Sequence, residues 1–276
     1  EWTQELSTSL CTLFNKSFTS GLIPTEWKTA NITPIHKRGP KHKKENYRQV
    51  SLTSIVCKVA EKIVRSRVTA FWSEHPVLNP HQFGYLKGKS TLAQLLSCFH
   101  DWSLSRNNSK ITDVVFLDLS KAFDSVPHER LLLKLNKYGI DGALLLWFRQ
   151  FLTKRQQRVG IRGMYSSWWA VTSGVPQGTI LGPMLFLIYV NDIPNIVKSS
   201  AKLFADDTKI YRELSHDSDT SILQSDLDSL EEWTRNWQVK FNPEKCEVMR
   251  ISYCKQDKRN HQYYLSKYKV KMRGLL

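Results

Sequence analysis

The sequence of 276 residues predicts an α+β fold, in which a small β-sheet carries helices on one face. Three stretches support this prediction. DVVFLDL, residues 113–119, is a compact apolar run typical of a strand, LFADDTKIY, residues 203–211, predicts a β-hairpin, and EVMRI, residues 247–251, predicts a further strand. Helical patterns separate them, so the order is strand, helix, hairpin, helix, strand.

The first third of the chain is mixed. A helical pattern through Leu10 and Phe14 stops near Gly21. Thr91 and Gln94 form a capping box before a helix that reaches Trp102. Between them, residues 55–72 predict an amphipathic packing helix. Its apolar positions near helical spacing are Ile55, Val59, Ile63 and Phe71.

The remaining elements follow from local signals. Pro127 in a first turn and Gly139 just past an end bracket one helix, and GALLLWFRQFLTKR, residues 142–155, predicts a second. A β-leaning stretch leads to Val171, and the Gly/Pro-rich loop SGVPQGTILGP, residues 173–183, enters another helix. Leucine and tryptophan positions from Leu223 to Trp237 trace the apolar face of the last helix.

Charge is concentrated in two segments. The formal net charge is +15. Residues 28–48 hold seven Lys or Arg against one Glu, and residues 245–276 hold nine against two acids. Such localisation indicates a polyanionic partner, and nucleic acid is the usual one, although two solvated basic loops are the alternative.

Composition narrows the class further. The five cysteines show no CxxC spacing, so neither a disulfide framework nor a zinc site is indicated. No run approaches the ~18 apolar residues of a membrane span, and the polar start EWTQELSTS does not resemble a signal peptide. We therefore expect a soluble intracellular protein without a membrane partner.

Paired acids in the predicted hairpin suggest metal chemistry. Asp206 and Asp207 sit in a short apolar run, where burial penalises unpaired charge, and Asp118 ends the apolar strand VVFLD, residues 114–118. If that strand lies beside the hairpin, Asp118 and Asp206 are neighbours and need a cation to stay ionised. Mg²⁺ bound by carboxylates and substrate phosphates fits this need, although an acidic turn without function is the simpler alternative.

These motifs together resemble the reverse transcriptases of non-LTR (LINE-type) retrotransposons. FLDLSKAFDSVPH (116–128), SGVPQGTILGP (173–183) and FADD (204–207) resemble the family's motifs A, B and C, and NPEKCEVM resembles motif D. WKTANITPIHKRG with NYRQVSL resembles the fingers motifs, and HQFGYLKGKST resembles the segment before motif A. The resemblance implies a right-hand polymerase with fingers, a palm built on a split β-α-β sheet, and a thumb that is largely missing.

The resemblance also implies roles for single residues. It assigns the metals, two Mg²⁺ ions, to Asp118, Asp206 and the adjacent Asp207, and proton donation to pyrophosphate to Lys245. For the substrate, it implies that Lys37 and Arg48 of the fingers grip the triphosphate and that Phe123 is the aromatic gate under the sugar. The loop that packs against the nascent base pair would contain Pro176, Gln177 and Gly178. Simpler alternatives stay open. Phe123 could be a core residue, Lys37 and Lys245 could be solvated surface lysines, and Gly178 could belong to an ordinary turn.

Two positions depart from the family pattern. Gln49 stands where Pro is usual, and Leu86 stands where Arg is common. Along the chain we expect a fingers-like region at 1–112, a palm with motifs A to D at 113–252, and a degraded primer grip and basic tail at 253–276.

The implied function is RNA-directed DNA synthesis, a nucleotidyltransferase reaction. Its partners would be an RNA template, a DNA primer and deoxynucleoside triphosphates, within a longer polyprotein that carries an endonuclease and a thumb. The family implies nuclear localisation. A catalytically silent nucleic-acid-binding remnant is the first alternative. A two-metal nuclease is the second, but it has no use for Phe123 or the VPQG loop.

Overall fold

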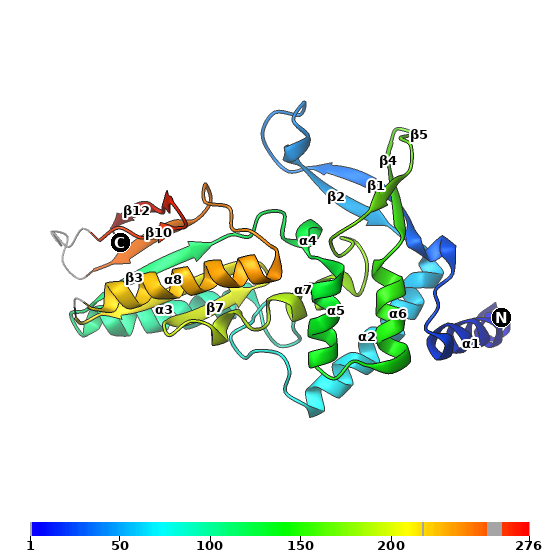
Figure 1. The fold of residues 1–276 in the computed structure, drawn as a ribbon, viewed down its shortest axis with the longest axis horizontal. Coiled ribbons are helices and arrows are strands. Elements are labelled where there is room, and N and C mark those ends of the chain that lie inside the picture. The colour runs from blue at the N-terminus through cyan, green and yellow to red at the C-terminus, as the bar shows by residue number, and fades with distance from the viewer. Residues whose placement is uncertain (1, 217, 253–260, 276) are drawn as a thin grey trace. The chain divides into compact units, whose positions relative to one another are not determined.

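The computed structural model describes residues 2–216, 218–252 and 261–275. The chain forms two compact units, each built from two separate stretches (Figure 1). Glu1–Val77 and Phe123–Ile188 form the first unit, and Leu78–Ala122 and Tyr189–Leu276 form the second. The predicted regions, fingers-like at 1–112, palm at 113–252 and tail at 253–276, are functional divisions along the chain and stay a prediction.

The first unit combines helices with a mixed sheet. Its helices are α1 (Trp2–Ser20), α2 (Ile55–Glu74), α4 (Ala122–Ser125), α5 (His128–Lys137), α6 (Gly142–Leu152) and most of α7 (Gly182–Val190). Its strands are β1 (Thr29–His36), β2 (Tyr47–Leu52), β4 (Arg155–Ile161), β5 (Met164–Tyr165) and β6 (Trp169–Val171). The sheet order is β2-β1-β4-β5, with β6 on β4, and β1 runs antiparallel to β2 and parallel to β4.

Aromatic packing forms the core of this unit. Trp147, Phe148 and Phe151 on α6 are fully buried, and the rings of Trp147 and Phe151 stack at 5.6 Å. The indole N–H of Trp147 donates to Ser17 Oγ at 3.1 Å, which ties α6 to α1. The helix predicted at 142–155 is confirmed as α6, but it ends at Leu152, and Arg155 is the first residue of β4.

The second unit is a five-stranded sheet with helices on both faces. Its strands are β3 (Ile111–Leu117), β7 (Ser200–Phe204), β8 (Asp207–Leu214), β9 (Glu247–Ile251) and β12 (Lys271–Leu275), in the order β12-β9-β3-β8-β7. Its helices are α3 (Thr91–Asn107) and α8 (Ser218–Trp237), and β10 (Tyr264–Leu265) pairs with β11 (Tyr268–Lys269). The predicted order of strand, hairpin and strand is confirmed.

The prediction that helices cover one face is wrong. Val114 and Tyr211, which pair across β3 and β8, pack against Cys98 of α3. Arg212, the next residue on β8, points to the other face and pairs with Asp219 of α8 at 2.9 Å. Both faces of β3 are therefore buried, and its sequence reads as a continuous apolar run for that reason.

Two further local predictions need correction. Helix α3 starts one residue earlier than the capping box suggests, because Ser90 is the N-cap and its Oγ accepts the Ala93 N–H at 3.1 Å. On α2 the predicted packing face is wrong, since Ile55 is 80% exposed. The buried face of α2 consists of Cys57, Ala60, Glu61, Val64, Val68 and Trp72.

The C-terminal segment is partly described. Residues 253–260 and 276 of the predicted basic tail lie outside the described residues. In the described part, Tyr263 donates to Asp113 at 2.8 Å, and Asp113 forms a bidentate pair with Arg250 at 2.7 Å for both contacts. All three residues are buried, so this network fastens the segment to β3 and β9. No helix among the described residues has the length and apolarity needed to span a membrane.

Candidate active site

The strand pairing of the second unit brings the three predicted acids together. Leu117 pairs with Thr208 across β3 and β8, so the following residue, Asp118, is level with Asp207. Phe204 pairs with Asp207 across β7 and β8, which leaves Ala205 and Asp206 as a two-residue turn. The expected hairpin beside the strand is confirmed.

The electrostatics of this turn disfavour three free carboxylates. Burial raises the pKa of Asp206 above its usual value, and the negative charges of Asp207 and Asp118 raise it further. A backbone hydrogen bond and Lys245 act in the opposite direction. A proton or a bound cation would relieve this electrostatic cost.

Lys245 is one such cation. Its Nζ lies 3.0 Å from Asp118 Oδ2, and its side chain is mostly exposed. The loop that carries it is fixed to the end of β3, because Asn242 N–H donates to the Asp118 carbonyl oxygen at 2.8 Å. The structure thus joins two predicted site residues that are 127 positions apart in the sequence.

The donor set suits a hard divalent cation that also binds substrate. Asp118 and Asp206 supply carboxylate oxygens, which Mg²⁺ prefers. Among the described residues, no group of three or more His, Cys, Asp or Glu side chains is arranged to hold a metal ion. A Mg²⁺ site of this kind keeps positions for water and for substrate phosphates, so two carboxylates are a sufficient protein contribution.

Sequence reasoning missed the support of the hairpin turn. The Gln82 side chain, 1% exposed, accepts the Ala205 N–H at 2.9 Å and the Gly84 N–H at 2.7 Å. A Cβ added to Gly84 would lie 2.4 Å from the Ala205 nitrogen. The available sequence signal was that HQFG, residues 81–84, lies in the segment that resembles the region before motif A. That resemblance implied no role for Gln82.

In the first unit, Arg48 lies on β2 and Lys37 directly follows His36, the last residue of β1. Ile35 pairs with Arg48 across β1 and β2, and Lys37 N–H donates to the Asn46 carbonyl oxygen at 2.8 Å. Ile35 and Arg48 therefore share a face of the sheet, and Lys37 lies just beyond the end of β1, next to this pair along the hairpin. Both are exposed, as a pair that grips an anion must be.

The loop at 173–183 is held tightly against β2 and α2. Ser51 N–H donates to the Gln177 carbonyl oxygen at 2.6 Å, and a Cβ added to Gly178 would lie 2.6 Å from the Ser51 carbonyl oxygen. Gly178 also has φ +104°, a value that L side chains rarely adopt. Glu61, fully buried on α2, accepts the N–H groups of Ile180 and Leu181 at 2.8 and 3.0 Å.

Phe123 lies beside this loop within the first unit. Its ring stacks on Phe186 of α7 at 4.5 Å with 14° between the planes, and its carbonyl oxygen accepts the Val175 N–H at 2.8 Å. The side chain is half-buried, so one part packs and another part faces outward. Phe123 can therefore pack against Phe186 and still present part of its ring as the predicted aromatic gate. Pro176 and Gln177 are half-buried in the same loop.

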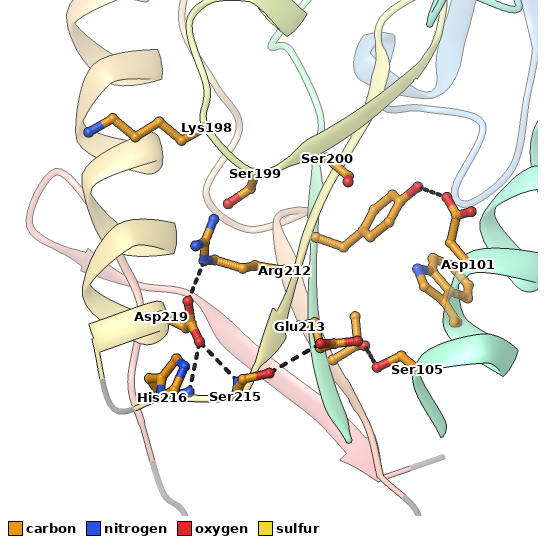
Figure 2. A pocket seen from close by; sticks show the side chains of 13 residues that line it. Asp101, Ser105, Lys198, Ser199, Ser200, Arg212, Glu213, Ser215, His216 and Asp219 are labelled. Carbon is orange, nitrogen blue, oxygen red and sulfur yellow. Dashed lines mark hydrogen bonds and ion pairs between the residues drawn. The ribbon is translucent and has the colours of Figure 1, made fainter. Parts of the chain in front are cut away.

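A separate pocket of about 520 Å³ lies in the second unit, between α3, β8 and the start of α8 (Figure 2). Arg212 and Asp219 form an ion pair in its wall, and Tyr211 donates to Asp101. None of the predicted site residues lines it. Glu213, also in the lining, pairs with Lys110 outside it at 2.5 Å.

Comparison with known proteins identifies the family. Residues 35–274 match the family model described as reverse transcriptase (RNA-dependent DNA polymerase). The chain is 31% identical over 247 residues to the RNA-directed DNA polymerase from mobile element jockey of Drosophila melanogaster, covering 86% of this chain and 27% of that protein. It is 28% identical over 174 residues to the retrovirus-related Pol polyprotein from type-1 retrotransposable element R2 of Popillia japonica, covering 63% and 24%.

A solved structure shares the fold. Apo telomerase from Candida tropicalis, truncated from its C-terminal domain, aligns with a TM-score of 0.56 at 12% sequence identity. The alignment covers 94% of this chain and 57% of that chain. This likeness concerns the fold, and the chain spans about a quarter of the length of the curated relatives named above.

Proposed function

Because the chain belongs to the reverse transcriptase (RNA-dependent DNA polymerase) family, we propose that it carries the nucleotide-adding centre of an RNA-directed DNA polymerase. The predicted kinship with non-LTR retrotransposon enzymes is confirmed, and so is the α+β fold of polymerase fingers and palm. One observation supports the proposal above others: the pairing of β3 with β8 gathers Asp118, Asp206 and Asp207 at one turn.

We assign metal binding to these three acids. Two bound Mg²⁺ ions would supply charge stabilisation to both the attacking and the leaving oxygen of an in-line phosphoryl transfer. Asp118 and Asp206 would hold these ions, and Asp207 would add negative charge from the adjacent position. The primer 3′-OH attacks the α-phosphate of the incoming nucleotide, and pyrophosphate leaves.

The remaining residues orient the substrate. Lys37, just beyond β1, supplies a point charge to the triphosphate, and Arg48 on β2 of the same hairpin supplies a planar fork. Phe123 excludes a ribose 2′-OH with the outward part of its ring. Pro176, Gln177 and Gly178 pack against the nascent base pair, and Lys245 gives a proton to the leaving pyrophosphate.

The partners follow from the same proposal. They are an RNA template, a DNA primer and deoxynucleoside triphosphates, and the parent chain is a longer polyprotein with an endonuclease and a thumb. The relatives are themselves much longer than this chain, which supports the last point. Nuclear localisation belongs to this proposal on the family resemblance alone.

A primer-extension assay tests the function. An RNA template with an annealed DNA primer, Mg²⁺ and the four deoxynucleotides should give extended primers with the parent chain. Asp118→Asn and Asp206→Asn should each abolish extension without loss of fold, because Asn keeps the size of Asp but removes the charge that the metal balances. Near wild-type incorporation by either variant would contradict the two-metal assignment. No extension by a folded parent chain would favour the silent remnant.

A further inference from the structure

The turn that presents Asp206 has an unusual backbone. Ala205, which precedes Asp206 in the two-residue turn, has φ +55°, in the left-handed region that residues with a Cβ seldom occupy. Such a conformation persists only where its surroundings hold it. The turn therefore needs a fastening.

A single buried side chain supplies that fastening. Gln82 Oε1 accepts the Ala205 N–H at 2.9 Å, and Gln82 Nε2 donates to the Ala205 carbonyl oxygen at 3.4 Å. Gln82 thus binds both backbone polar groups of the strained residue. Its orientation is defined, since Oε1 also accepts the Gly84 N–H at 2.7 Å and two N–H donors require an oxygen.

The segment around Gln82 is itself fixed to the hairpin. Leu203 N–H donates to the His81 carbonyl oxygen at 2.9 Å, and Phe83 N–H donates to the Leu203 carbonyl oxygen at 2.8 Å. Gly84 approaches so closely that a Cβ there would meet the Ala205 nitrogen at 2.4 Å. Residues 81–84 therefore form a strap along β7 that places Gln82 beneath the turn.

We propose that Gln82 is a positioning residue, which holds the Ala205–Asp206 turn so that the Asp206 carboxylate faces Asp118. The proposal deepens the proposed function and rests on it for the role of Asp206. A displacement of about 1 Å at a reacting centre can cost ~10²-fold in rate, so loss of the fastening should lower kcat. It should leave the KM for deoxynucleotides nearly unchanged, because the proposed triphosphate contacts, Lys37 and Arg48, belong to the other unit of the chain.

The test compares Gln82→Met with Gln94→Met. Gln94 is also fully buried in this unit, but it binds only the Lys209 side chain, at 2.8 Å, and its Nε2 has no partner among the described residues. In primer extension, Gln82→Met should lower kcat at least tenfold with KM within about threefold, and Gln94→Met should change neither. Equal losses in both variants would overturn the proposal, since they would indicate general destabilisation.

Hydrogen exchange of the metal-free chain gives a readout that does not depend on activity. NMR should show slow exchange of the Ala205 amide in the parent chain, and at least tenfold faster exchange in Gln82→Met but not in Gln94→Met. Fast exchange of this amide in the parent chain would overturn the proposal even if no variant folds. So would unchanged exchange or unchanged kcat in Gln82→Met.

A second variant, Gly84→Ala, perturbs the same turn without changing Gln82. Gly84→Ala keeps Gln82 but forces a methyl group against Ala205, so it should also lower kcat with little change in KM. Wild-type kcat in Gly84→Ala would contradict the close approach. If the parent chain exchanges slowly at Ala205 but does not extend primers, the proposed function fails while the fastening itself stands.

Discussion

Replacement of Glu61 tests how the loop at 173–183 is held. Glu61 is fully buried on α2, and one of its oxygens accepts both the Ile180 and Leu181 N–H groups, at 2.8 and 3.0 Å. Arg155, 3% exposed, contributes a favourable charge interaction. A single carboxylate thus joins α2 to the segment that enters α7.

The structure sets the expected magnitude. A hydrogen bond to a charged group contributes ~1.5–3 kcal/mol, and an unpartnered buried N–H costs ~1–3 kcal/mol. Glu61→Met leaves two N–H groups without an acceptor and Arg155 without a nearby negative charge, so we expect a loss of about 3–5 kcal/mol in the free energy of unfolding. Glu61→Gln retains an acceptor oxygen and should lose less.

The two variants also differ from the parent chain in pH dependence. Burial raises the pKa of Glu61 above the ordinary value of 4.5 for a glutamate, and this effect outweighs the lowering by its hydrogen bonds and by Arg155. Between pH 4.5 and the raised folded pKa, the folded chain holds a proton that the unfolded chain has released. The stability contributed by Glu61 is therefore largest below pH 4.5 and falls as pH rises through the folded pKa. Glu61→Gln should lack this decline.

Urea unfolding followed by tryptophan fluorescence from pH 4.5 to 8 measures both effects. Val64→Ala, a buried apolar change on the same helix, is the control and should destabilise equally at every pH. A cost below about 1 kcal/mol for Glu61→Met would refute the anchoring role. A difference between parent and Glu61→Gln that does not change with pH would refute the titration argument.

Three other outcomes are expected. Phe123→Val should admit ribonucleotides, lowering the ratio of dNTP to rNTP incorporation at least tenfold, and an unchanged ratio would leave Phe123 only its packing role on Phe186. Neutralising three exposed lysines should flatten the log–log salt dependence of RNA–DNA hybrid binding by ~0.9 per lost phosphate contact, whereas an unchanged slope would mean that they face solvent. These lysines are Lys41, Lys43 and Lys44. Asp113→Asn should cost ~3–5 kcal/mol in urea unfolding because the buried Arg250 loses its carboxylate partner, and a cost under about 1 kcal/mol would contradict this.

Local patterns were sufficient for many elements. The apolar run before Asp118, the acidic hairpin and EVMRI are strands in the structure, with EVMRI at Glu247–Ile251 as predicted. Pro127 and Gly139 bracket α5 at His128–Lys137, and Gly139 has the positive φ of +83° that suits a helix end. These signals depend on backbone preferences of neighbouring residues, which the sequence displays directly.

The sequence placed Asp118 beside the hairpin only on the condition that the strand and the hairpin pair in one sheet. The structure confirms this pairing and supplies its register. The resemblance to non-LTR reverse transcriptases supported the same grouping. Lys245 was predicted from the resemblance alone, and the structure adds its contact with Asp118.

The sequence by itself thus determined the order of elements, the family and the acids of the candidate site, because each depends on short-range pattern. Only the tertiary structure decided which face of α2 is buried: Glu61 is buried, whereas the more apolar Ile55 is exposed. It also revealed Gln82 beneath Ala205, 123 positions away. The physical reason is the same in both cases. A buried polar side chain is stable only when distant backbone groups satisfy it, and composition or periodicity cannot show where those groups will lie.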